Sequence, residues 1–150
     1  MSKALDHADL MAARISSAPA AGEEPTTIDI THVPCVVDRQ KDILSVINEA
    51  VARDSGIAIV ILWQGFTTLD QDSPNPRIAN RYTVTVYSQP VIAGANLPAD
   101  NVMESVIQRL LGWVPAGNHY NDRAQINNGG MMPDRSLLIY DCEVTIPSSL

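Results

Sequence analysis

Three stretches of the chain have the hydrophobic pattern of β-strands. The run from Ile57 to Trp63 (IAIVILW) is continuously apolar and too short for a buried helix, so it predicts a strand covered on both faces at the centre of a sheet. The segment from Arg81 to Ser88 alternates apolar and polar residues, which predicts a half-exposed antiparallel strand. The segment from Ser136 to Ile146 alternates as well and predicts the last strand.

Three other stretches have the period of amphipathic helices. Apolar residues recur at spacings of three and four in residues 2–15, 38–55 and 100–111. In the third stretch, Asp100 stands where an N-cap would accept a hydrogen bond from the first turn, and Gly112 stands where the helix would end. We therefore expect one short helix at the amino terminus and two longer ones further along.

The remaining segments are one further extended segment and three connections. Residues 28–37 are β-branched and apolar enough for a strand, and Pro34 points to an edge or an irregular end because proline cannot donate to the ladder. Residues 16–27 lack a hydrophobic period and indicate a linker, and residues 67–80 indicate a polar loop. The segment from Val114 to Arg135 is polar and rich in asparagine and glycine, so it is also expected to be a loop.

The order of these elements predicts an α+β fold. We expect a mixed or mostly antiparallel sheet of about four strands, with two helices packed on one face and an N-terminal helical arm. Residues 1–27 form the arm and linker, and residues 28–150 form a single domain. Leu110 and Ile107 should both be fully buried under the sheet. The opposite face is either plain solvent surface or a surface made for burial against another protein, and it would carry Thr83, Thr85, Tyr87, Glu143 and Thr145.

Composition and charge narrow the function classes. The chain has 150 residues, of which 45% are hydrophobic, enough for a sizeable core without disulfides or metals. A formal net charge of -7 argues against a general phosphate-binding surface, because affinity for nucleic acid comes largely from Lys and Arg. An acidic surface suits a protein that DNA passes without sticking. Neither a signal peptide nor a membrane-spanning run is recognisable, so we expect a protein made and kept in the cytoplasm.

The sequence predicts no catalytic, cofactor or metal site. Cys35 and Cys142 lie in separate apolar stretches, which is typical of reduced core cysteines. His7, His32 and His119 are scattered, without the spacing of a helical metal site. No nucleophile elbow, Walker loop or dinucleotide fingerprint occurs. We therefore expect a protein that is not an enzyme.

The arm and the long loop are the candidate assembly elements. Both hold few apolar residues in any period, so neither is expected to offset its ordering entropy within one monomer. The arm could fold back on its own domain or dock on a neighbouring subunit, and we expect both segments to order fully only against neighbours. The candidate assembly contacts are Leu5, Leu10 and Ile15 in the arm and Met131 and Met132 in the loop.

With these elements placed, residues 35–147 resemble the tail-terminator, or tail-completion, and minor tail proteins of long-tailed bacteriophages. The resemblance lies in the order of four segments: IAIVILW, RYTVTVYSQPVI, ADNVMESVIQRLLGW and SLLIYDCEVTI. It implies a virion structural protein, assembled in the host cytoplasm, that forms a ring, commonly a hexamer.

Such a ring caps the tail tube, stops its growth and presents the tail to the head. The implied partners are further copies of the chain, the tail tube and the head–tail connector proteins, with DNA only passing through the lumen. No cofactor or membrane is involved. The alternatives are a head–tail connector or neck protein, or a non-viral protein-binding module.

Overall fold

The computed structural model describes residues 3–38, 56–69, 71–89, 98–118, 122–134 and 137–149. Within these residues the fold is α+β, as predicted, with two helices and a mixed sheet of five strands instead of about four. The predicted helix over residues 38–55 lies almost wholly outside the described residues. The elements in chain order are α1 (Lys3–Ser16), β1 (Cys35–Val37), β2 (Ile57–Thr68), β3 (Arg77–Ser88), α4 (Ala99–Leu110), β4 (Gln125–Asp134) and β5 (Leu137–Ser149).

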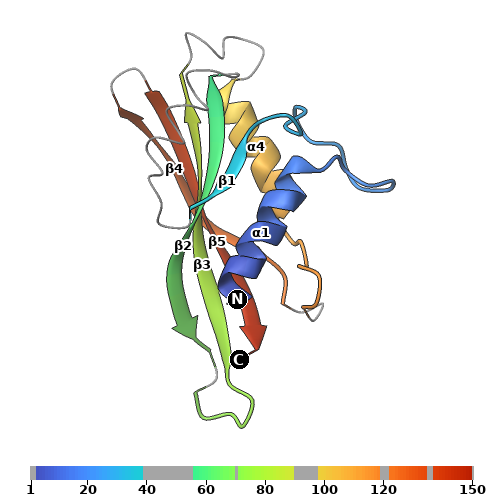
Figure 1. The fold of residues 1–150 in the computed structure, drawn as a ribbon, viewed down its shortest axis with the longest axis vertical. Helices are drawn as coiled ribbons and strands as arrows, with labels where there is room; N and C mark the ends of the chain where they lie inside the picture. Colours follow the sequence, from blue (N-terminus) through green and yellow to red (C-terminus); the bar gives the residue numbers. More distant parts are fainter. Residues whose placement is uncertain are drawn as a thin grey trace.

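The sheet has the strand order β1-β2-β3-β5-β4 (Figure 1). The short strand β1 is parallel to β2, and every other neighbouring pair is antiparallel. Pro34 indicated an edge or an irregular end, and the strand that follows it, β1, is outermost among the described strands. The strand predicted at the centre, β2, is instead second from that edge, and β3 is the central strand.

Both described helices pack on the same face of the sheet (Figure 1). The alternation of β3 places Tyr82, Val84 and Val86 on this face, where all three are fully buried. The helix α1 inserts Met11 and Ile15 into the same core, and both side chains are fully buried. The expectation that the arm orders only against neighbours is therefore wrong, because its apolar stripe is covered by its own domain.

The face of the sheet opposite the helices is also partly apolar. Ala58 and Val60 of β2 are buried there, with Tyr87 and Leu137 packed against them. Thr85, expected on an exposed face, is buried as well. The first half of β2 is thus covered on both faces, as its continuous apolar sequence predicted.

Helix α4 lies close to its predicted position but has a different cap. Its N-cap is Pro98, which makes no side-chain cap hydrogen bond, and Asp100 lies in the first turn. An acidic residue there still interacts favourably with the helix dipole. Gly112 has a φ of 75° and follows the end of the helix, as predicted. Leu110 is fully buried as expected, whereas Ile107 is only partly buried.

Two predicted loops are partly strand. The loop predicted over residues 67–80 is shorter than expected, because β2 continues to Thr68 and β3 already begins at Arg77. The loop predicted from Val114 to Arg135 contains β4, which pairs with β5 along almost its whole length. The sequence QINNGGMM has no strand pattern of its own. The main-chain groups on one side of it pair with the long, well-patterned neighbour β5, and this pairing makes it a strand.

Candidate assembly surfaces

The outermost strand β4 presents one apolar edge of the sheet. It pairs with β5 alone among the described strands, and residues 125–132 contain no charged side chain. Met131 and Met132 are 54% and 59% exposed. The strand ends in Pro133 and Asp134, so the uncharged part that can serve as a template for pairing with another chain is residues 125–132.

The two methionines of β4 lie on opposite faces of the sheet. Met131 is opposite Tyr140 in the ladder, and Tyr140 packs against the core on the helix face. Met132 is opposite Ile139 and so lies on the other face. A partner alongside β4 would therefore meet an apolar side chain on each face.

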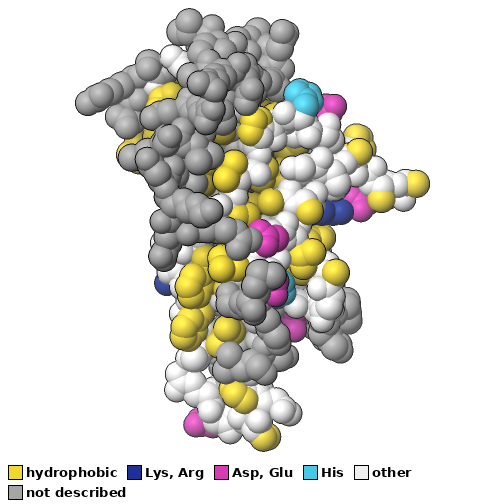
Figure 2. Space-filling model, in the orientation of Figure 1, with side chains coloured by type: hydrophobic (Ala, Val, Ile, Leu, Met, Phe, Trp, Pro, Cys, Tyr) yellow, Lys and Arg dark blue, Asp and Glu magenta, His cyan; other side chains and the backbone are white. Residues whose placement is uncertain are grey.

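The second half of β2 presents another edge. The strand β1 pairs only with Ile59, Val60 and Ile61, and in the described part of the chain no strand lies on the outer side of Leu62–Thr68. Trp63 and Phe66 are 39% and 54% exposed there. Figure 2 shows hydrophobic side chains gathered over this lower part of β2.

Trp63 and Phe66 both lie on the helix face. Trp63 is opposite Tyr82 and Phe66 is opposite Asn80, with a bulge between Trp63 and Gly65 that keeps both side chains on one side. The indole Nε1 of Trp63 donates a hydrogen bond of 3.2 Å to Oδ1 of Asn80, which fixes the ring at the edge. The Trp63 side chain nevertheless remains substantially exposed.

The predicted assembly contacts divide into two groups. Met131 and Met132 are exposed on a strand edge, where a partner can reach them. Ile15 is fully buried in the core, and Leu5 and Leu10 are partly buried. In this conformation the arm stabilises its own domain, while the methionines remain open to contact.

Sequence reasoning missed the edge formed by Phe66. The residue lies in the polar sequence QGFTT, which does not continue the apolar run before it. The bulge before Phe66 interrupts the two-residue alternation, so no local pattern marks this segment as strand. A single aromatic residue in a polar stretch was the one available signal.

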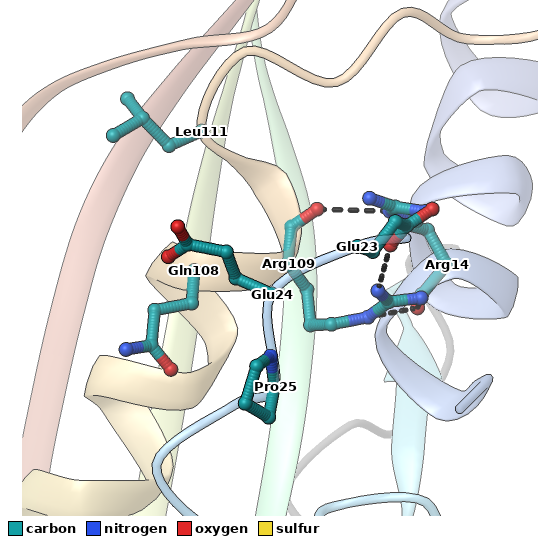
Figure 3. A pocket seen from close by; sticks show the side chains of 7 residues that line it. All are labelled: Arg14, Glu23, Glu24, Pro25, Gln108, Arg109 and Leu111. Carbon is teal, nitrogen blue, oxygen red and sulfur yellow. Dashed lines mark hydrogen bonds and ion pairs between the residues drawn. The ribbon is translucent and has the colours of Figure 1, made fainter. Parts of the chain in front are cut away.

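A hollow of about 330 Å³ lies where the C-terminal ends of α1 and α4 meet the linker. Figure 3 shows Arg14, from α1, and Arg109, from α4, meeting at Glu23 of the linker. The Glu23 carboxylate accepts hydrogen bonds from Arg14 (3.0 Å) and Arg109 (2.7 Å). The residues lining the hollow are Arg14, Glu23, Glu24, Pro25, Gln108, Arg109 and Leu111.

This arrangement is a structural clamp. Arg109 is only 3% exposed, and its guanidinium also donates to the carbonyl oxygen of Arg14 and to Ser17 Oγ. Hydrogen bonds from Arg14 and then from Arg109 hold the pKa of the Glu23 carboxyl below its ordinary value. Both guanidinium groups are occupied by protein acceptors, so the clamp closes the linker over the helices.

The described cysteines and histidines lie apart and form no reactive or metal-binding cluster. Burial raises the pKa of the Cys35 and Cys142 thiols to about 12, which disfavours the reactive thiolate. His7 is buried in α1, and His32 is exposed with Nδ1 3.9 Å from Asp29 Oδ2. His119 lies outside the described residues.

The described residues hold neither a metal-binding cluster nor a membrane-spanning helix. They contain no group of three or more His, Cys, Asp or Glu side chains placed to hold a metal ion. Among the same residues, no helix is both long enough and apolar enough to cross a membrane.

Compared with models of protein families and with curated protein sequences, the chain matches none.

Proposed function

We propose that this protein is a virion structural protein, a subunit of a ring that terminates the bacteriophage tail tube and joins the tail to the head. One observation carries the proposal: exposed apolar side chains lie on two different edges of one sheet, Met131 and Met132 on β4 and Trp63 and Phe66 on β2. Two unlike edges on identical subunits favour head-to-tail contacts, and these close into a ring when the rotation between subunits allows it.

The position in the virion rests on the resemblance of residues 35–147 to tail-terminator proteins. That resemblance implies a ring that is commonly a hexamer, with the tail tube and the head–tail connector proteins as neighbours. A net charge of -7 supports the same role, because an acidic subunit lets DNA move through the lumen without binding it. The proposed role needs no catalytic residue.

The test of the ring is the mass and shape of the purified full-length protein. We expect a closed particle whose mass is a multiple of 16.2 kDa by multi-angle light scattering, with a central hole in negative stain. Particles no larger than a dimer at high protein concentration would contradict the ring.

The test of the position uses phage parts lacking the protein. Labelled rings are mixed with isolated tails and with isolated heads, and their binding is imaged. Binding at one end of the tail supports the tail terminator. Binding to heads alone favours the neck protein, and binding to neither favours a non-viral module.

A further inference from the structure

The two sheet edges are complementary in strand direction. Within one subunit β2 is antiparallel to β3, β3 to β5, and β5 to β4, so β2 and β4 run in opposite directions. If a second subunit continues the sheet beyond β4, its β2 lies beside β4 and antiparallel to it. The hydrogen bonds of an antiparallel pair run perpendicular to the strands, and this pairing is slightly more stable per residue than the parallel one.

We infer that neighbouring subunits join by strand addition, with the free edge of β4 pairing antiparallel with Leu62–Thr68 of the next copy. The inference rests on the proposed head-to-tail ring and names the contact that builds it.

The main chain of β2 is oriented for this pairing. Ile59 N–H donates to the carbonyl oxygen of Pro34, and the carbonyl oxygen of Ile61 accepts from Asp38 N–H, so both residues turn their polar groups away from β3. Main-chain groups alternate in direction along a strand. Those of Trp63 therefore also point outward, where β1 has already ended.

The side chains match once the sheet is continuous. Trp63 and Phe66 lie on the helix face of β2, and Met131 lies on the helix face of β4. A shared sheet puts the methionine of one subunit on the same side as the aromatic rings of the next. Methionine sulfur packs favourably against aromatic rings, and its flexible chain adapts to an irregular surface.

Both segments that would pair are free of charged side chains, which favours a second copy of the chain as the occupant. Neither Leu62–Thr68 nor residues 125–132 contain a charged side chain, although edge strands of monomeric proteins are commonly protected by charge. Pairing β4 with β4 would also be antiparallel, but it would produce a closed dimer and leave Trp63 and Phe66 exposed. Pairing β4 with β2 covers both apolar edges in every subunit.

Charged substitutions on each edge test the contact. Met131→Lys and Phe66→Lys should each raise the concentration for half-assembly by roughly tenfold or more, because a lysine on the edge opposes strand pairing. Leu111→Lys is the control, since Leu111 is 63% exposed and follows the end of α4, outside both of the segments that would pair. It should assemble like the wild type. Circular dichroism and melting curves check that all three variants fold.

Mixing the two edge variants distinguishes the mode of pairing. The M131K subunit keeps an intact β2 edge and the F66K subunit keeps an intact β4 edge, so the mixture should form 1:1 heterodimers while each variant alone stays monomeric. Homodimers of F66K alone would show β4–β4 pairing and overturn the inference. Rings of M131K and F66K with wild-type affinity would also overturn it, and would leave the proposed ring standing.

Disulfide trapping in the full-length protein provides a test that does not depend on weakening the contact. Thr67→Cys is combined in turn with a cysteine at Asn128, Gly130 or Met132, which all lie on the face opposite the helices. One combination should give a covalent ladder under oxidising conditions, and Thr67→Cys with Glu104→Cys on α4 should give none. If the wild type forms rings but no cysteine pair is trapped, strand addition is contradicted and the ring stands. If a covalent ladder forms from open chains, the ring is contradicted and strand addition stands. A monomeric wild type contradicts both.

Discussion

Arg14 and Arg109 each donate a hydrogen bond to the main-chain carbonyl oxygen of the other. The bond from Arg14 Nε to the oxygen of Arg109 is 2.9 Å, and Nη2 of Arg109 is 3.2 Å from the oxygen of Arg14. Both acceptors lie in the last turn of a helix, where carbonyl groups lack intrahelical partners. The two arginines thus satisfy the ends of α1 and α4 and hold Glu23 between them.

Replacing Arg109 with Ala should lower the free energy of unfolding by about 2–3 kcal/mol, because the change removes a buried guanidinium together with its hydrogen bonds to Glu23, Ser17 and the carbonyl oxygen of Arg14. Urea denaturation of the monomer measures the effect. Arg81→Ala removes an exposed arginine from β3 and is the control, with an expected change within about 0.5 kcal/mol. Equal stability of the two variants would show that the clamp contributes nothing.

Replacing Glu23 with Gln should remove part of the acid sensitivity of the fold. The pKa of Glu23 is lowered in the folded protein, chiefly by the Arg14 hydrogen bond and then by that from Arg109. The carboxylate therefore stabilises the fold above the ordinary pKa of 4.5, and this contribution is lost as the pH falls through the folded value. The wild type should be more stable than E23Q at neutral pH, and the difference should disappear in acid.

Urea denaturation over a pH series measures the dependence on Glu23. Glu24→Gln removes the same formal charge one residue further along and is the matched control. It should keep the wild-type difference between neutral and acidic stability. A Glu23→Gln variant with an unchanged pH profile would contradict the role of this carboxylate.

Truncating the core side chain of the N-terminal helix should destabilise the monomer. Ile15 is fully buried, so Ile15→Ala should cost about 2–5 kcal/mol. Leu111→Ala, at an exposed position, should change stability little. Deletion of residues 1–21 should unfold the domain. Amide hydrogen exchange offers an independent measurement, and rapid exchange throughout α1 in the monomer would contradict its place in the core.

The two adjacent glycines of β4 should respond differently to alanine. A Cβ atom at Gly129 would lie 3.1 Å from the main-chain oxygen of Asp141, whereas one at Gly130 would come no closer than 3.8 Å to Asp141 Oδ1. Gly129→Ala should therefore destabilise the β4–β5 pair by about 1 kcal/mol or more, since the neighbouring main chain must move. Gly130→Ala should be neutral or slightly stabilising. Thermal denaturation of both variants measures the difference. Equal melting temperatures would contradict the close approach of the Asp141 main-chain oxygen to Gly129.

Local patterns in the sequence determined the elements that carry their own period. The helical spacing of apolar residues located α1 and α4, and the alternation of β3 assigned Tyr82, Val84 and Val86 to the core. The spacing of apolar residues indicates which side of a helix or strand faces the core, because that spacing follows from the number of residues per turn or per pleat. The exposed methionines of β4 were also singled out from sequence, although on an expected loop.

The tertiary structure alone decided the features that depend on a distant partner. β4 is a strand because β5 pairs with it, and Phe66 is an edge residue because β3 extends β2 beyond the bulge. Arg14 and Arg109 are 95 positions apart, and no local signal connects them. The fold decides which groups come within hydrogen-bonding distance of one another, and these groups determine where a main chain pairs and where a polar side chain can be buried. Because the partners are far apart in the sequence, the residues next to each of them do not predict the pairing.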